Sequence, residues 1–154
     1  MSTLASSSFS SVPNYSLFSI PAMWLVSFLP HPYAVALSKG RFKNSSPRQM
    51  MADLLAKKDK TKLDQKIIRA ESAQMNGFEN LGFFAAAVVA ANYAKVPSHE
   101  LNTLTGGYIA SRILFNFLYI FVESEAVAGL RSASFVGGVA MVFTLFIKAG
   151  LRLK

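Results

Sequence analysis

The chain alternates long apolar segments with shorter polar ones. Four apolar segments stand out, at residues 17–37, 78–94, 101–122 and 132–147. A helix needs roughly 20 mostly apolar residues to cross the hydrocarbon core of a bilayer, and these segments are near that length. The pattern predicts an all-α integral membrane protein built as a four-transmembrane-helix bundle.

The first apolar segment contains prolines that bear on its shape. Pro21 fits the first turn of a helix, but Pro30 and Pro32 fall where each would remove a helical hydrogen bond. We therefore expect a bent span. Trp24 and Tyr33 are candidates for anchors at the membrane–water interface, where amphipathic rings are enriched.

The connections between the apolar segments differ in length. Residues 95–100 are a short turn, which predicts an antiparallel hairpin of the second and third spans. Residues 38–70 form a long basic loop, expected to be solvated or a frayed helix. The Ser-rich residues 1–16 lack the basic start of a secretory signal and are predicted to be a flexible tail. The remaining residues, 17–154, are predicted to form a single domain.

Composition supports the membrane interpretation, and charge gives the expected orientation. The chain is 52% hydrophobic and only 16% charged, whereas soluble domains are about 25% charged. Ten of its basic residues lie between Lys39 and Arg69, opposed by three aspartates. The positive-inside rule places such a loop in the cytosol, where it can also touch anionic membrane lipid. Nucleic-acid binding is disfavoured, because Phe42 is the loop's single aromatic residue.

The chain has no cysteine, which excludes disulfides, thiolate metal sites and a cysteine nucleophile. Any reacting thiol would have to come from a substrate. Its two histidines, His31 and His99, lie far apart in sequence, and no metal-ligand cluster is predicted.

A polar row leads into the second span. Arg69, Ser72, Asn76 and Glu79 occupy relative positions 0, 3, 7 and 10, so one helix would place them on one stripe. A polar stripe at the mouth of a membrane helix suggests a site where a polar ligand meets the lipid boundary. The same stripe is also explained by a boundary anchor at Arg69 and inter-helix pairs, and the spacing leaves both interpretations open.

A second polar stripe lies inside the third span. Arg112 is near its middle, and Phe115 and Tyr119 follow on the same face, beside Asn116. A cation at membrane depth costs roughly 2.5–3.5 kcal/mol on insertion scales, so it is normally paired or lines a wet cavity. Glu79 is the first candidate partner of Arg112. Such an ion pair would hold the bundle together without excluding a role in a site.

Three segments, taken in order, resemble a known family. They are RAESAQMNGFENLGFFAAAVVAAN, LNTLTGGYIASRILFNFLYI and GLRS, and the run NYSLFSIPAMWLVSFLPHPYA precedes them. Together they resemble the MAPEG family, the membrane-associated proteins in eicosanoid and glutathione metabolism, in its fungal and bacterial-type form. The resemblance covers about residues 14–150. It implies a homotrimer of four-helix membrane subunits that binds glutathione between neighbouring subunits at the cytosolic end.

The resemblance also implies ligand-binding residues. Asn76 and Glu79 fall on the family's N-x-x-E motif, which holds the glutathione backbone. Arg112 matches the third-helix arginine that lines the site, and Arg69 lies on the same stripe as the motif. Arginines can fork onto the carboxylates of glutathione, and Glu79 can accept hydrogen bonds from its ammonium group.

The resemblance implies catalytic roles for Arg131 and Tyr119. Arg131, in the run GLRS, matches the arginine that stabilises the glutathione thiolate, and Tyr119 matches a tyrosine that lines the site. Two positions differ from many glutathione-using relatives, which carry an arginine where this chain has Ser72 and a tyrosine where it has Phe115. A basic residue such as Arg41 is a candidate to replace the missing carboxylate clamp.

Three functions remain open at this point. The first is a membrane-bound glutathione transferase or peroxidase acting on lipophilic electrophiles, located in the endoplasmic reticulum. The second is a glutathione-independent relative that isomerises or cyclises a lipophilic metabolite in the same cavity, suggested by Ser72 and Phe115. The third is a non-catalytic membrane partner, in which the polar stripes serve packing alone.

Overall fold

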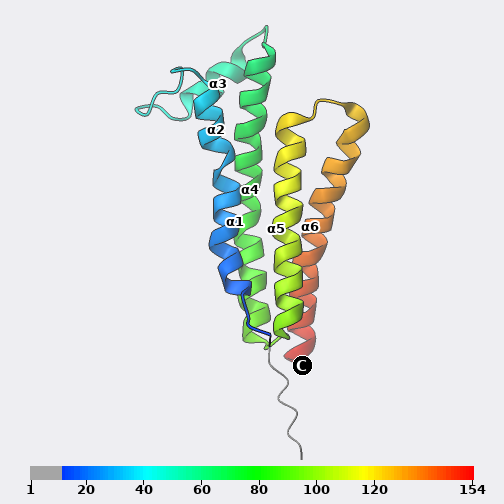
Figure 1. Cartoon of the computed structure of the whole chain (residues 1–154). Coiled ribbons are helices and arrows are strands. Elements are labelled where there is room, and N and C mark those ends of the chain that lie inside the picture. The colour runs from blue at the N-terminus through cyan, green and yellow to red at the C-terminus, as the bar shows by residue number, and fades with distance from the viewer. Residues whose placement is uncertain (1–11) are drawn as a thin grey trace, which may run out of the picture.

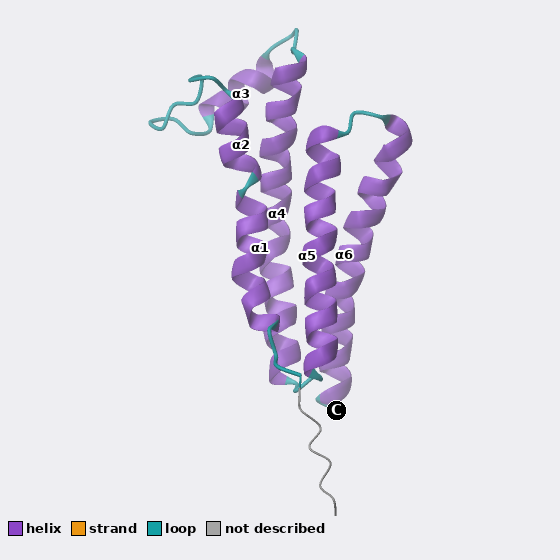
Figure 2. Ribbon diagram, viewed as in Figure 1, coloured by secondary structure: helices purple, strands orange, loops and turns teal. Residues whose placement is uncertain are grey.

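The computed structural model describes residues 12–154, except for the side chains of residues 125–127. This part of the chain is all-helical and contains no strand, as the apolar pattern predicted (Figure 2). The elements are η1 Ser16–Phe18, α1 Ser19–Phe28, α2 Pro30–Leu37, α3 Gln49–Ala56, α4 Lys62–Tyr93, α5 Ser98–Phe121 and α6 Glu125–Arg152. Figure 1 shows α1 and α2 lying along α4, with α5 and α6 beside them and α3 near the start of α4.

The predicted bend in the first span is confirmed at Leu29, which separates α1 from α2. Pro30 has no N–H, so it cannot donate to the carbonyl of Val26 four residues earlier. Asn116 of α5 replaces that donor, because its Nδ2 lies 3.0 Å from the carbonyl oxygen of Val26. An unpaired carbonyl is costly in lipid. Asn116 of α5 therefore compensates for the backbone hydrogen bond that Pro30 removes from the first span.

The helix α4 begins earlier than the sequence suggested. The predicted second span starts near residue 78, but α4 starts at Lys62 and runs for 32 residues. Its start is fixed by a capping box, in which the backbone N–H of Asp64 donates to Thr61 Oγ1 at 3.1 Å and the backbone N–H of Thr61 donates to the Asp64 carboxylate at 3.1 Å. The predicted polar stripe and the apolar run therefore belong to one continuous helix.

The basic loop is more ordered than a solvated loop or a frayed helix. It contains α3, which buries Met50 and Leu54 against Ile67 and Ala70 of α4. Two apolar residues four positions apart are enough to give a short helix a packed face.

Close helix contacts in the bundle occur at particular glycines. A Cβ on Gly138 of α6 would lie 2.6 Å from Ser111 Oγ of α5, and one on Gly77 of α4 would lie 2.8 Å from Ser27 Cβ of α1. Gly107 approaches Met141 in the same way. Small residues that allow backbones to approach are the usual means of packing helices in a membrane.

The predicted hairpin of the second and third spans is also present. Ala94 ends α4, Pro97 precedes α5, and the two helices pack against each other. Both the described start of the chain and its C-terminus lie at this end of the bundle, whereas α3 and the α5–α6 connection lie at the other (Figure 1).

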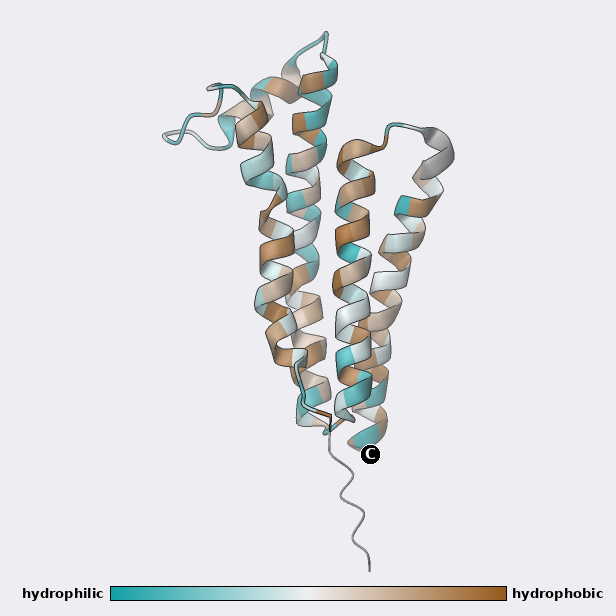
Figure 3. Cartoon of the chain, viewed as in Figure 1, coloured by the Kyte–Doolittle hydropathy of each residue, from teal (hydrophilic) through white to brown (hydrophobic). Residues whose placement is uncertain are grey.

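Within the described residues, three segments have the length and composition of a membrane span: Ser16–Leu37, Ser98–Phe121 and Ala128–Arg152. The helix α4 is not among these segments, because its first half is polar and only its second half is apolar. In Figure 3 the upper half of α4 alternates between hydrophilic and hydrophobic residues, whereas α1 is largely hydrophobic. The chain is an integral membrane protein.

The predicted flexible tail falls partly outside the described residues, since residues 1–11 are not described. The described part is held to the bundle. Asn14 Nδ2 donates to Asn92 Oδ1 at 2.7 Å, and the backbone N–H of Tyr15 donates to Asn102 Oδ1 at 2.8 Å. Ser16 is fully buried. The bundle therefore begins slightly before residue 17.

Candidate functional site

Arg112 is the most deeply buried charged residue of the membrane-level part of the bundle, with 1% of its surface exposed. Its Nη2 donates to Oδ1 of Asn76, so α5 and α4 are joined through a neutral amide. The expected ion pair with Glu79 is wrong, because Glu79 is exposed on α4 and the hydrogen bond goes to Asn76 instead.

Aromatic rings provide the remaining stabilisation of this cation. The Arg112 guanidinium carbon lies 4.5 Å from the ring centroid of Phe115 and 5.3 Å from that of Phe135. A cation within about 6 Å of a ring centroid is attracted by the ring's quadrupole, more strongly where water is absent. Arg112 Nε has no hydrogen-bond partner among the described residues. The Phe115 ring therefore contacts the arginine directly.

A cavity of about 400 Å³ adjoins this contact, between α4, α5 and α6. Its lining residues come from all three helices: Asn76, Phe115, Arg131, Ser132, Phe135 and Val136. Two of the six predicted site residues, Asn76 and Arg131, therefore face one cavity. Phe135 was not predicted, because an aromatic residue in an apolar span gives no sequence signal that distinguishes a site from lipid contact.

Among the lining residues of this cavity, Arg131 is the cation. Its guanidinium lies over the ring of Tyr119 at 5.0 Å, which brings together the two residues predicted to be catalytic. No ion pair or hydrogen bond of its side chain is found among the described residues. A guanidinium of this kind keeps five N–H donors for an anionic or thiolate ligand.

Arg69, which was predicted to contact a ligand, is bonded to residues at and just beyond the end of α5. Its Nη2 lies 2.6 Å from Glu123 Oε1, and its Nε donates to the carbonyl oxygen of Ile120 at 3.3 Å. Arg69 holds the pKa of Glu123 below its ordinary value. These contacts tie α4 to the end of α5 at the turn into α6. Glu79, by contrast, has no recorded hydrogen bond or ion pair among the described residues.

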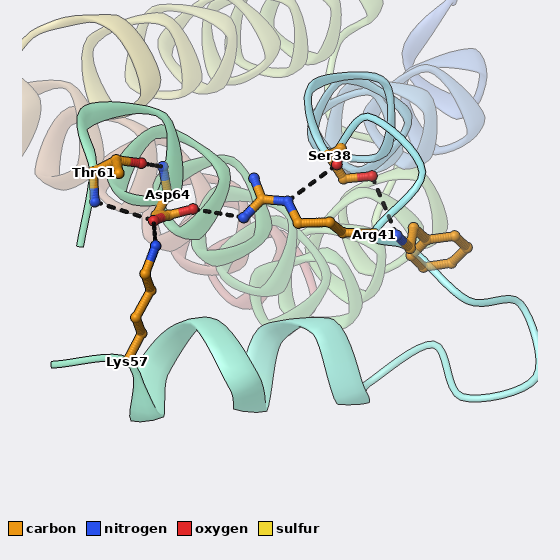
Figure 4. A network of polar contacts seen from close by, with 6 residues as sticks. Ser38, Arg41, Lys57, Thr61 and Asp64 are labelled. Carbon is orange, nitrogen blue, oxygen red and sulfur yellow. Dashed lines mark hydrogen bonds and ion pairs between the residues drawn. The ribbon is translucent and has the colours of Figure 1, made fainter. Parts of the chain in front are cut away.

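Arg41 is not available as a replacement clamp in this structure, because it belongs to the network around Asp64 (Figure 4). Arg41 Nη1 lies 2.7 Å from Asp64 Oδ1, and Lys57 Nζ lies 2.6 Å from Asp64 Oδ2. Arg41 and Lys57, together with the backbone of Thr61, hold the pKa of Asp64 far below its ordinary value. The network fixes both ends of the basic loop to the start of α4.

Sequence reasoning missed a pair that joins α2 to α4. His31 Nδ1 lies 2.9 Å from Glu71 Oε1 and 3.2 Å from Oε2. The sequence offered a weak signal only, an acidic residue next to the polar stripe and a histidine between two prolines. In residues 12–154 no group of three or more His, Cys, Asp or Glu side chains is placed to hold a metal ion.

The comparisons with known proteins agree with the family resemblance. The model of the MAPEG family matches residues 17–151, which is nearly the whole chain. The comparisons found no match among curated proteins or among solved structures. On the extent of the family match, this all-helical integral membrane protein belongs to the MAPEG family.

Proposed function

We propose that the protein is a membrane-bound glutathione transferase or peroxidase that acts on lipophilic electrophiles, with glutathione as co-substrate. One observation carries the proposal: the unpaired guanidinium of Arg131 stacks on Tyr119 and faces the cavity that Asn76 also lines. The family is generally associated with glutathione. In the same cavity, the apolar side chains of Phe135 and Val136 lie beside Arg131 and could contact a lipophilic substrate.

Arg131 would act on the thiol of the co-substrate. A free thiol has a pKa of about 8.5 and is mostly protonated at neutral pH. An adjacent guanidinium favours the thiolate and so raises the fraction of the nucleophilic form. The thiolate then attacks an electrophilic carbon, the leaving group departs with the bonding electrons, and the thiol proton passes to water.

Glutathione carries two carboxylates, and of the three arginines predicted to line the site only Arg131 has no side-chain hydrogen bond or ion pair among the described residues. Arg69 is already paired with Glu123, and Arg112 is buried against Asn76. We therefore propose that the site is completed by a second copy of the chain in a homotrimer. Exposed Glu79 is the residue proposed to accept the ammonium group. Crosslinking of the detergent-purified protein should give a trimer band.

The membrane arrangement is proposed as four spans, with α4 crossing as well as the three more apolar segments. The helix α4 lies along the other spans over their whole length (Figure 1). The basic loop at residues 38–70 favours a cytosolic position for that end of the bundle, and the endoplasmic reticulum is the proposed membrane. Protease protection of the loop in sealed microsomes tests the orientation.

The activity test uses glutathione and chlorodinitrobenzene with the purified protein. The variant Arg131→Ala should lose most of the conjugation rate, while Arg131→Lys, which keeps the charge but not the fork, should retain part of it. Arg152→Ala, in the last turn of the same helix, is the matched control and should keep the full rate. Equal conjugation rates for Arg131→Ala and Arg152→Ala would show that Arg131 does not contribute to the activity.

A second candidate is a glutathione-independent isomerisation or cyclisation of a lipophilic metabolite. The engagement of Arg69 with Glu123 favours it, because that pair leaves one cation fewer for a carboxylate. Turnover of a lipophilic substrate without any thiol would support this function. A strict requirement for thiol would refute it.

A further inference from the structure

A second and larger cavity lies on the other side of α4. Its volume is about 680 Å³, and α2, α3 and α4 surround it. It shares no lining residue with the cavity at Asn76. At about 100° per residue, Phe78 points roughly 200° away from Asn76 around α4. The two cavities are therefore separate, and this inference does not rest on the proposed glutathione chemistry.

A bonded polar pair, His31 and Glu71, lines this second cavity, and Arg48 and Gln74 line it as well. Glu71 is buried, with 9% of its surface exposed, and His31 is its recorded partner among the described residues. An ionised carboxylate can only accept hydrogen bonds, so the contact at 2.9 Å requires a proton on His31 Nδ1. In the neutral ring, Nε2 is then a hydrogen-bond acceptor.

The orientation of the His31 ring is fixed on several sides. Glu71 holds Nδ1 with both carboxylate oxygens. The ring of Phe42 meets it edge-on at 5.6 Å, and the ring of Phe28 lies at 6.3 Å. No hydrogen-bond partner of Nε2 is found within residues 12–154. A histidine ring that is fixed in orientation, with one nitrogen that lacks a partner, can accept a hydrogen bond from the hydroxyl of a ligand without rearranging.

The walls of the cavity favour an aromatic ligand. Three methionines, Met50, Met51 and Met75, line it together with Phe78. Methionine side chains adapt to ligands of irregular shape, and their sulfur atoms make favourable contacts with aromatic rings. The cavity therefore combines one directed acceptor and the polar side chains of Arg48 and Gln74 with soft, ring-binding walls.

We propose that this cavity is a binding site for a lipophilic phenol, whose hydroxyl donates to Nε2 of His31 while its ring packs against the methionines and Phe78. The Glu71 carboxylate orients the histidine ring through Nδ1. A ligand without a hydroxyl donor fills the same walls but leaves Nε2 without a partner.

The test compares naphthol with its methyl ether, which keeps the aromatic ring but cannot donate. Both are titrated into the full-length protein in one detergent, and their dissociation constants are measured by fluorescence. The wild type should prefer naphthol by about fivefold, the usual net effect of one hydrogen bond. His31→Phe, whose ring has no acceptor nitrogen, should abolish the preference while still binding the ether. Each ligand partitions into the detergent to the same extent with either protein, so partitioning does not affect this comparison.

Two further measurements keep the proposal testable if His31→Phe does not fold. Ala52→Trp places a large side chain in the cavity without touching the His31–Glu71 pair, and it should weaken both ligands by tenfold or more. In the wild type, naphthol but not the ether should shift the Nε2 nitrogen resonance of His31. Equal binding of the two ligands, an unmoved resonance or displacement of naphthol by glutathione would each overturn the proposal.

Discussion

Two clusters along α4 hold cations in opposite ways. At its start, Asp64 is bonded to Arg41 and Lys57, whose side chains are 42% and 44% exposed. Twelve residues further on, Asn76 accepts from Arg112, which is 1% exposed and lies over the rings of Phe115 and Phe135. The first cluster joins a carboxylate to two cations that reach solvent, whereas the second joins a buried cation to a neutral amide.

The difference shows what each cluster can do. The cations at Asp64 are screened by salt and can exchange partners with water, so the cluster fixes a loop without being costly to open. Arg112 is 1% exposed, and Asn76 supplies the one hydrogen bond of its side chain among the described residues. The membrane-level cluster therefore contributes to the stability of the bundle, and the loop-level cluster contributes mainly to local order.

The largest predicted effect comes from leaving Arg112 without its partner. Asn76→Leu should destabilise the bundle by about 3–5 kcal/mol, because it strands a buried cation. The thermal midpoint in detergent should fall on the order of 10 °C. Asn76→Asp, which restores an acceptor, should stay near the wild type. If Asn76→Leu proved as stable as Thr144→Leu, at a half-buried position of α6, the contrast between the clusters would be wrong.

The next effect tests packing at membrane depth. Gly77→Ala would place a Cβ within 3.0 Å of the backbone of Ser27, and overpacking of this kind costs about 1–3 kcal/mol. Gly82→Ala, on the same helix with nothing within 4 Å, should be neutral or slightly stabilising. Matched unfolding curves of the two variants provide the measurement. Equal stabilities would show that α1 and α4 are not in direct contact there.

The loop-level cluster should respond in local order rather than in global stability. Asp64→Asn removes the carboxylate that Arg41 and Lys57 share, so trypsin should cleave the basic loop several-fold faster. The thermal midpoint should move little. Asp53→Asn, an exposed position in α3, is the control and should not change cleavage. A rise in salt should speed cleavage of the wild type but leave the unfolding of the Arg112 cluster unchanged.

The pH dependence of this loop follows from the same pair of cations. Arg41, and after it Lys57, keep the pKa of Asp64 below its ordinary value. The contribution of Asp64 to order is therefore complete above the ordinary carboxyl pKa of about 4 and is lost as pH falls through the lowered value. The protection of the loop amides from hydrogen exchange should be constant between pH 5 and about 7. Loss of protection near pH 6 would contradict the assignment.

The smallest effect is expected at the pair of Arg69 and Glu123. The Glu123 side chain is 52% exposed, and exposed pairs contribute little to stability. Glu123→Gln should shift the thermal midpoint by no more than about 2 °C. If glutathione uses Arg69, freeing it in this variant should strengthen binding, which a calorimetric titration can detect.

Three of the predicted spans coincide with segments that have the length and composition to cross a membrane, because apolar length is a property of local sequence. The bend at Pro30 was predictable for the same reason, although the residue that compensates it, Asn116, was not. The partner of Arg112 was predicted wrongly as Glu79, because helical spacing places both Asn76 and Glu79 near the stripe without saying which faces α5. The pair of His31 and Glu71 was missed because it depends on how α2 packs against α4, which neither segment specifies alone.

The central claim is that the cavity beside Arg131 and Asn76 binds glutathione through the predicted polar residues. The direct measurement is calorimetric titration of glutathione into the detergent-purified protein, with Glu79→Ala, Arg131→Ala and the control Asp53→Ala. Saturable binding that the first two variants lose and the control keeps is the predicted result. No binding at millimolar glutathione, or binding that all three variants retain, would contradict the claim.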